Sequence, residues 1–202
     1  MGKANKLYGV ILAGGKSSRM GKDKATLSID NETMLERNTK LLESIGVDQV
    51  VISRNEPGYL ADLYPGHGPM AGIHSALNDT KCITKDNALI IVPIDMPLLD
   101  HQLLTELVNC GQAMHCALYF SDYQLPLYLP NTMGNRDYAE LVAKSDQDRS
   151  IKRFLNIINS ASIKTTAIDK LHNMNNIEQW QQAVNELYEQ QVNETMRSQH
   201  GV

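Results

Sequence analysis

A run of seven residues without a polar side chain, Ala88–Ile94, is the feature that most constrains the fold of this chain. A strand that faces solvent on one side alternates apolar and polar residues, whereas a strand covered on both faces does not. The run is therefore typical of a central strand with helices on both sides of its sheet. Shorter apolar runs predict further strands at Leu7–Leu12, Gln49–Ile52, Cys116–Phe120, Leu125–Leu129 and Thr165–Ile168.

Helical patterns lie between several of these runs. Apolar residues recur at helical spacing in residues 34–45, 103–108 and 177–188, and Gly46 is placed to end the first of these helices. Strand and helix signals that alternate are typical of βαβ units, so we expect one α/β domain with a mostly parallel sheet. We place this domain in residues 1–192 and expect the polar segment 193–202 to be disordered.

Length and composition narrow the possible classes of function. The 202 residues suffice for one α/β domain with a full core, and the net charge of −4 argues against a general nucleic-acid binder. The three cysteines show no CxxC spacing, so they indicate reduced thiols rather than a disulfide framework or a zinc site. No apolar run approaches the length of a membrane span. We expect a cytoplasmic protein that binds neither nucleic acid nor membrane.

The stretch LAGGKSSRMGKDK, residues 12–24, follows directly on the first predicted strand. It carries four cationic side chains and one aspartate, a local net charge of +3 in an acidic chain. Glycines let backbone N–H groups approach phosphate oxygens, and Lys and Arg supply countercharge. The spacing fits neither the P-loop nor the GxGxxG dinucleotide motif. The stretch is either a phosphate-binding loop of another kind or a basic, solvated turn.

Four segments of the chain resemble one family. The loop motif LAGGxSxRMGxDK at residues 12–24 is similar to the signature of GT-A-like nucleotidyltransferases, and most of all to that of the molybdenum cofactor guanylyltransferases. The segments 68–73 (GPMAGI), 93–97 (PIDMP) and 173–175 (NMN) resemble three further elements of that family, in the same order. The resemblance covers nearly the whole chain. It departs at Ile94, where the family often has Cys, and at Asn176-Ile177, where the family usually has Thr-Pro.

The resemblance implies a fold, an activity and a set of site residues. It implies a three-layer α/β/α, Rossmann-like nucleotidyltransferase domain that transfers GMP from GTP to molybdopterin with the help of Mg²⁺. The implied catalytic residues are Arg19, Lys24 and Asp95, with Asp95 as the metal ligand. The implied GTP-binding residues are Leu12, Ala13, Gly14, Gly15, Lys24, Asn55, Asp62 and Asp95. The implied residues on the pterin side are Asn173 and Asn175.

Each of these assignments has a structural alternative. Asp95 at a strand end could hold a metal or form an Asx turn, and Asp62 could recognise guanine or be a surface aspartate. The pair Asn173 and Asn175 also fits a simple turn. Gly68 and Gly72 fit either a close approach to a ligand or the entry to a helix. Arg149 and Arg153 could meet the phosphate of the pterin, although a structural pair is the simpler interpretation.

Three functions remain open from the sequence alone. The leading one is a guanylyltransferase that uses GTP and molybdopterin, with transient contacts to proteins that deliver molybdopterin or receive the product. The second is a cytidylyltransferase or another small-molecule nucleotidyltransferase. Relatives of that kind typically have LAAG where this chain has LAGG at residues 12–15. The third is a non-catalytic nucleotide- or cofactor-binding module, which the retained charges of Arg19, Lys24 and Asp95 disfavour.

Overall fold

The computed structural model describes residues 6–14, 24–79 and 87–200 and contains a central six-stranded sheet in the order β4-β1-β5-β7-β6-β8. Of its strands only β7 is antiparallel to the others in this described sheet, which is therefore mostly parallel, as predicted. The strands are β1 Leu7–Leu12, β4 Gln49–Ser53, β5 Ala88–Pro93, β6 Ala117–Phe120, β7 Leu127–Pro130 and β8 Ser160–Ile163, with β2 Ser28–Ile29 and β3 Glu32–Thr33 in a separate ribbon.

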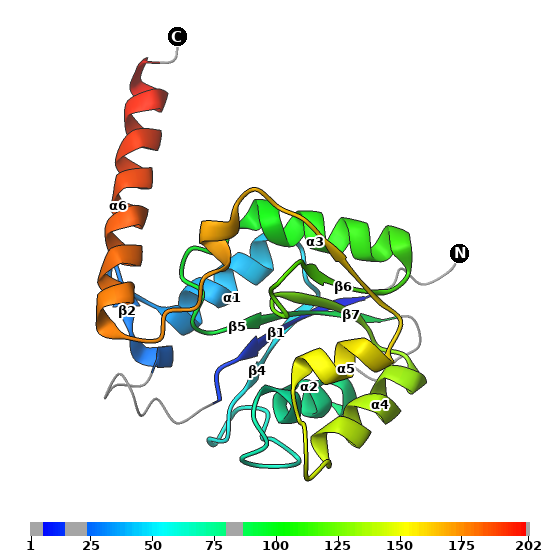
Figure 1. The fold of residues 1–202 in the computed structure, drawn as a ribbon. Helices are drawn as coiled ribbons and strands as arrows, with labels where there is room; N and C mark the ends of the chain where they lie inside the picture. The colour runs from blue at the N-terminus through cyan, green and yellow to red at the C-terminus, as the bar shows by residue number, and fades with distance from the viewer. Residues whose placement is uncertain (1–5, 15–23, 80–86, 201–202) are drawn as a thin grey trace.

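Helices cover both faces of this sheet and make three layers (Figure 1). The helices are α1 Met34–Ser44, α2 Pro69–Asn78, α3 His101–Met114, α4 Met133–Ala143, α5 Ile151–Ile157 and α6 Ile177–His200, with short 3₁₀ helices η1 Lys24–Thr26 and η2 Ile168–Leu171. One hydrophobic cluster joins α1, α3 and α6 to one face, and a second joins α2, α4 and α5 to the other. The three-layer α/β/α architecture is confirmed.

The strands β1 and β5 form the buried centre of the sheet. Both are buried at every residue, because each has a neighbouring strand on either side and helices above and below. Successive side chains point to opposite faces, so Ile11 joins the cluster with α1 and α3, whereas Val10 and Leu12 join the cluster with α2. This is the physical reason why the run Ala88–Ile94 has no polar side chain.

Helix α3 packs so closely on β7 that one of its residues must be glycine. A Cβ atom on Gly111 would lie 2.2 Å from Cδ1 of Tyr128, whose ring is buried. We expect Gly111→Ala to destabilise the fold by about 1–3 kcal/mol, because overpacking outweighs the gain of about 1 kcal/mol in helix propensity. Urea unfolding measures the change. Gly134→Ala in α4 is the matched control, because nothing lies within 4 Å of its Cβ position. An unchanged unfolding midpoint for Gly111→Ala would contradict the packing.

The prediction of a strand at Thr165–Ile168 is wrong. The chain forms its strand a few residues earlier, at β8, which pairs with β6. This edge strand has the sequence SASI and a single neighbour, β6, so it has no apolar run that the sequence analysis could detect. The Thr165 hydroxyl instead accepts a hydrogen bond from the N–H of Ala167 and starts a turn into η2. Strand β7 also begins at Leu127 rather than at Leu125, since Pro126 has no N–H to donate to a sheet.

Helix α6 includes residues 193–200 of the tail for which the sequence analysis predicts disorder. Its backbone is helical from Ile177 to His200, and it projects well beyond the body of the molecule (Figure 1). The sequence of this helix is rich in Glu, Gln and other good helix formers and contains neither Gly nor Pro. The first turns of α6 pack against the sheet and start the helix, and the polar segment that follows can therefore continue it.

Candidate active site

The ends of three neighbouring strands form the floor of the site. Leu12 at the end of β1 pairs with Ser53 of β4 on one side and with Pro93 of β5 on the other. Two hydrogen bonds extend this pairing past the strands, from the N–H of Ala13 to the Ser53 carbonyl (3.0 Å) and from the N–H of Ile94 to the Leu12 carbonyl (3.2 Å). Ligands of open α/β sheets bind beyond the carboxyl ends of the strands, so this edge is the candidate site.

Lys24 and Asp95 meet above this floor. The ammonium Nζ of Lys24 lies 2.7 Å from Oδ2 of Asp95, and the two side chains are only 19% and 17% exposed. The same ammonium donates to Oδ1 of Asn175 at 3.3 Å. Residues separated by 71 and 151 positions in the chain thus converge on one point. The structure brings together three of the residues that the resemblance implies.

The segment 173–175 is fixed in place by its backbone. The N–H of Met174 donates to the carbonyl of Asp95 at 2.8 Å, and the Met174 side chain is buried. Asn176, which follows this segment, accepts a hydrogen bond from the N–H of Gln179 at 2.9 Å, so it caps the start of α6. The family usually has Thr at this position, and Thr is also a common N-cap residue. The departure at Asn176 therefore preserves a cap.

Asp62 lies on the other side of the floor, next to β4. Asn55 and Asp62 hold each other by two hydrogen bonds, from Nδ2 of Asn55 to Oδ2 of Asp62 (2.8 Å) and from the N–H of Asp62 to Oδ1 of Asn55 (2.7 Å). The hydroxyl of Ser53 donates to the second carboxylate oxygen of Asp62 at 3.4 Å. The hydroxyl of Ser75 accepts from the N–H of Leu63 at 2.8 Å and anchors the same loop. Sequence reasoning missed both serines, because no spacing signal distinguishes them.

The glycines of the segment 68–73 serve the entry and packing of α2. Gly68 is the N-cap residue, with φ of 71° and ψ of −163°, a conformation that essentially only glycine adopts. A Cβ atom on Gly72 would lie 2.6 Å from the hydroxyl oxygen of Ser53 and 2.9 Å from a methyl carbon of Leu12. Helix α2 can therefore lie directly against the site floor. This favours the helix-entry interpretation of both glycines over direct contact with a ligand.

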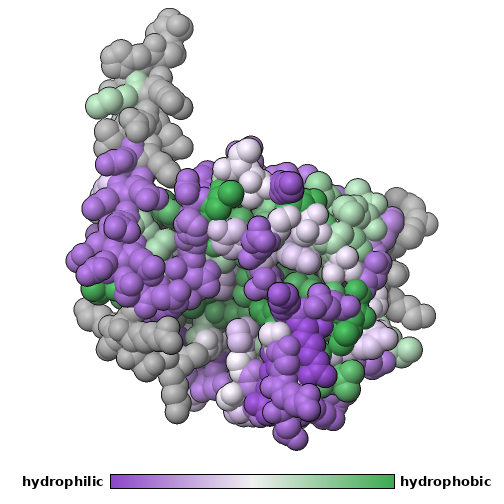
Figure 2. All heavy atoms as spheres, viewed as in Figure 1, coloured by the Kyte–Doolittle hydropathy of each residue, from purple (hydrophilic) through white to green (hydrophobic). Residues whose placement is uncertain are grey.

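A cleft of about 730 Å³ opens beside Asp95, because Met96 and Met174, which are next to Asp95 in the chain and in the fold, line it. Its walls come from the loop 122–125, from the segment 171–175 and from α6, and the N-terminus of α2 contributes Pro69. Figure 2 shows a hollow beside the lower part of α6, with hydrophilic surface on the helix and hydrophobic atoms in the hollow. Asn173 and Asn175, the two residues that the resemblance implies on the pterin side, line this cleft.

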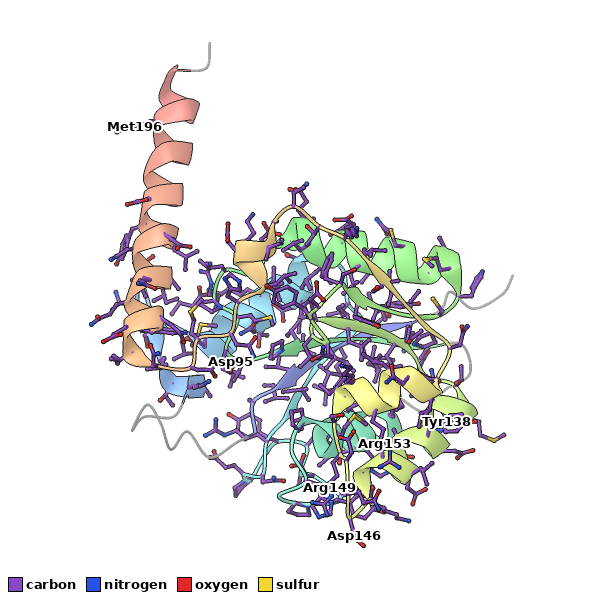
Figure 3. The ribbon with its side chains drawn as sticks, in the orientation of Figure 1. Asp95, Tyr138, Asp146, Arg149, Arg153 and Met196 are labelled. Atoms are coloured by element: carbon purple, nitrogen blue, oxygen red, sulfur yellow. The ribbon has the colours of Figure 1, made fainter. Side chains whose placement is uncertain are left out.

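Arg149 and Arg153 hold a loop elsewhere on the molecule. The guanidinium of Arg149 lies 3.7 Å from Asp146, and that of Arg153 donates to the Ser145 hydroxyl (2.7 Å) and the Asp148 carbonyl (2.8 Å). Figure 3 shows both arginines beside Asp146, away from Asp95. Neither lines the cleft beside Asp95. Their position supports the structural interpretation and not a contact with the phosphate of a pterin.

Two implied site residues, Gly15 and Arg19, lie outside the described residues. Among the residues that the structure does describe, no group of three or more His, Cys, Asp or Glu side chains could hold a metal ion. One carboxylate, Asp95, stands at the centre of the site. Mg²⁺ suits such a site, because it is commonly bound by one or two carboxylates together with phosphates and water rather than by a cage of protein ligands.

The comparison with solved structures finds the same fold in nucleotidyltransferases. The structure resembles the molybdopterin-guanine dinucleotide biosynthesis protein A of Archaeoglobus fulgidus with a TM-score of 0.73, at 20% identity, over 90% of this chain and 99% of that one. It also resembles the 2-C-methyl-D-erythritol 4-phosphate cytidylyltransferase of Thermus thermophilus with a TM-score of 0.65, at 14% identity, over 89% of this chain and 98% of that one.

The comparison with curated sequences is more specific. The chain is 36% identical over 183 residues to the molybdenum cofactor guanylyltransferase of Xanthomonas euvesicatoria pv. vesicatoria, which covers 88% of this chain and 94% of that protein. It is 30% identical over 172 residues to a probable molybdenum cofactor guanylyltransferase of Clostridium perfringens, over 80% and 84% of the two proteins. The model of the MobA-like NTP transferase domain matches residues 9–165. The chain therefore belongs to the family of MobA-like NTP transferases.

Proposed function

We propose that this protein is a molybdenum cofactor guanylyltransferase, which transfers GMP from GTP to the terminal phosphate of molybdopterin and releases pyrophosphate. The observation that carries the proposal is the position of the Lys24–Asp95 pair, 2.7 Å apart, between the Asp62 loop and the cleft. The names of the two curated relatives support the choice of base and acceptor. The products are molybdopterin guanine dinucleotide and pyrophosphate.

We propose that the substrates lie in the order of the strands. Neighbouring strands lie about 4.8 Å apart, so the ends of β4 and β5, with β1 between them, are about 10 Å apart, which is room for a nucleoside and its first phosphate. In the proposed pose the base lies near Asp62, beyond β4. Backbone groups of Leu12, Ala13 and Gly14 frame the nucleoside, and the α-phosphate lies at Lys24. The acceptor phosphate approaches from the cleft.

Asp62 is suited to recognise guanine. Its two carboxylate oxygens can accept hydrogen bonds from N1–H and the exocyclic amine of guanine, and only guanine presents both donors on that edge. Asn55 and Ser53 hold the carboxylate in position. We assign Asn55 this supporting role in addition to the ribose contact that the resemblance implies.

The chemistry needs no nucleophile from the protein. An oxygen of the acceptor phosphate forms a bond to the α-phosphorus of GTP, and the bond from that phosphorus to the pyrophosphate oxygen breaks with its electron pair. Negative charge grows on the α-phosphoryl oxygens and on the leaving pyrophosphate, so cations aimed there lower the barrier. Lys24 supplies one such cation, and we propose Arg19 as the second.

Asp95 is the proposed ligand for Mg²⁺. When bound, the ion would neutralise charge on the phosphates and orient them for in-line displacement. In the structure the ammonium of Lys24 neutralises the Asp95 carboxylate. Binding of metal and nucleotide therefore requires Lys24 to leave Asp95, and the α-phosphate offers the ammonium a new partner.

We propose that the reaction takes place in the cytoplasm. In the described residues every helix is too short or too polar to cross a lipid bilayer. We propose transient contacts with proteins that deliver molybdopterin or receive the finished dinucleotide.

Thermal-shift titrations with GTP, CTP, ATP and UTP, with and without Mg²⁺, test the nucleotide half of this proposal. A ligand that binds only the folded protein stabilises it by about 2.7 kcal/mol at a hundredfold excess over its dissociation constant. We expect a shift that is selective for GTP in the wild-type protein and lost in Asp62→Asn, which removes one of the two acceptors. A shift selective for CTP would assign the protein to the cytidylyltransferases, and the absence of any shift would favour a cofactor-binding module.

A further inference from the structure

Helix α6 supplies one wall of the cleft beside Asp95. Gln179, Gln182, Ala183 and Glu186 line the cleft, and their spacing of three and four residues places them on one face of the helix. The first of these positions lies next to the reacting groups, because the N–H of Asn175 donates to Oε1 of Gln179 at 2.8 Å and Asn175 accepts from Lys24. The stripe therefore begins at the reaction centre and leads away from it.

The length of this stripe is fixed by helix geometry. From Gln179 to Glu186 the helix rises by about 10.5 Å, at 1.5 Å for each residue. Tyr188 anchors the far end, because its phenol donates a hydrogen bond to the carboxylate of Asp30, which raises the pKa of Tyr188. Glu186 thus lies about 10.5 Å along the helix from Gln179. A phosphorylated heterocycle of two fused rings spans a similar length.

The charges of the cleft orient an anionic ligand. The lining residues include three carboxylates, Asp122, Asp169 and Glu186, and in the described part of the chain they include no Lys or Arg. A phosphate is repelled by this end and attracted by Lys24 at the other. The heterocycle of the acceptor must therefore lie toward Glu186. The rings of Tyr123 and His172, whose centroids are 6.1 Å apart, line the cleft as well and offer flat surfaces for stacking.

We propose that Glu186, assisted by Gln182, determines the specificity for the acceptor by accepting hydrogen bonds from the N–H and amino donors of its 2-amino-4-oxopyrimidine ring. This inference rests on the proposed function, because it assumes that the acceptor is a pterin that enters this cleft. Within the described residues, Gln182 and Glu186 have no hydrogen bond or ion pair to another side chain, so both groups are available to a ligand. A carboxylate is complementary to two neighbouring donors and repels an oxygen in the place of the amino group.

A pair of ligands that differ in one group tests this assignment. The probes are the monophosphate of 6-hydroxymethylpterin and its lumazine counterpart, in which an oxygen replaces the 2-amino group. Their fluorescence reports binding to the full-length protein. We expect the wild-type protein to bind the pterin about tenfold more tightly than the lumazine, as for one charge-assisted hydrogen bond. In Glu186→Gln this ratio falls close to one, whereas it persists in Glu189→Gln, an exposed carboxylate of the same helix outside the cleft.

Two further results would overturn the assignment. One is a wild-type ratio that Glu186→Gln leaves unchanged. The other is a ratio that instead disappears in Asp122→Asn or Asp169→Asn, the other two carboxylates of the cleft. A GTP-dependent thermal shift, measured on every variant, separates this failure from failure of the proposed function. If GTP still stabilises the variants, the nucleotidyltransferase proposal stands and only the role of Glu186 is lost.

Discussion

Asp95→Asn lowers the turnover of GTP and molybdopterin by about 100-fold or more and leaves the fold intact. Asn has the same shape as Asp and can still accept a hydrogen bond from Lys24, but it has no charge with which to bind Mg²⁺. Removal of one preorganised electrostatic group from a transition state typically costs a factor of about 10²–10³. Release of pyrophosphate measures the turnover, and a GTP titration without Mg²⁺ shows that the nucleotide still binds.

Asp100→Asn is the control for this substitution. Asp100 lies five residues further along, accepts from the N–H of Leu103 at 2.9 Å and caps α3. Asn caps helices about as well as Asp, so this variant retains its activity and most of its stability. Wild-type turnover in Asp95→Asn would contradict the metal assignment. A loss of turnover of equal size in Asp100→Asn would show that removal of any carboxylate near the end of β5 lowers the turnover.

Every strand of the central sheet except the edge strand β8 could be predicted from the sequence. Leu7–Leu12 is apolar because β1 has a strand on either side and helices on both faces, so every one of its residues is buried. Ser160–Ile163 forms an edge strand with one neighbouring strand. Its sequence alternates Ser with Ala and Ile, so it contains no apolar run from which a strand could be predicted. Strand β4 also lies at an edge, but its apolar run Val50–Ile52 made it predictable, so an edge strand is missed only where it has few apolar residues.

The candidate site divides in a similar way. Lys24 and Asp95 belong to motifs that the family resemblance identifies, and Asp62 was predicted from its position upstream of the segment 68–73. Ser53 and Ser75 were missed, because they only position the Asp62 loop through hydrogen bonds that depend on the tertiary fold. The cleft was also missed, since its walls come from parts of the chain that only the fold brings together.

Lys24→Met changes two measurable properties in opposite directions. Turnover falls by about 100-fold, because the α-phosphate loses its countercharge in the transition state. The affinity of the protein for Mg²⁺ without nucleotide rises by up to about fivefold, because Asp95 loses the ammonium that competes with the ion, and a partly exposed ion pair is worth about 1 kcal/mol. Single-turnover kinetics measure the first change, and calorimetric titration with Mg²⁺ measures the second.

The opposite signs separate this role of Lys24 from a purely structural one. A lysine that only supported the fold would lower both turnover and metal affinity when removed. Lys40→Met is the matched control, because Lys40 pairs with Glu32 at 2.7 Å on the surface and lies in a helix far along the chain from Asp95. If Lys24→Met bound Mg²⁺ more weakly than the wild-type protein, the ammonium would not compete with Mg²⁺ for Asp95. A rise in affinity means that Lys24 keeps Mg²⁺ from binding until the α-phosphate of GTP draws the ammonium away, so metal and nucleotide bind together.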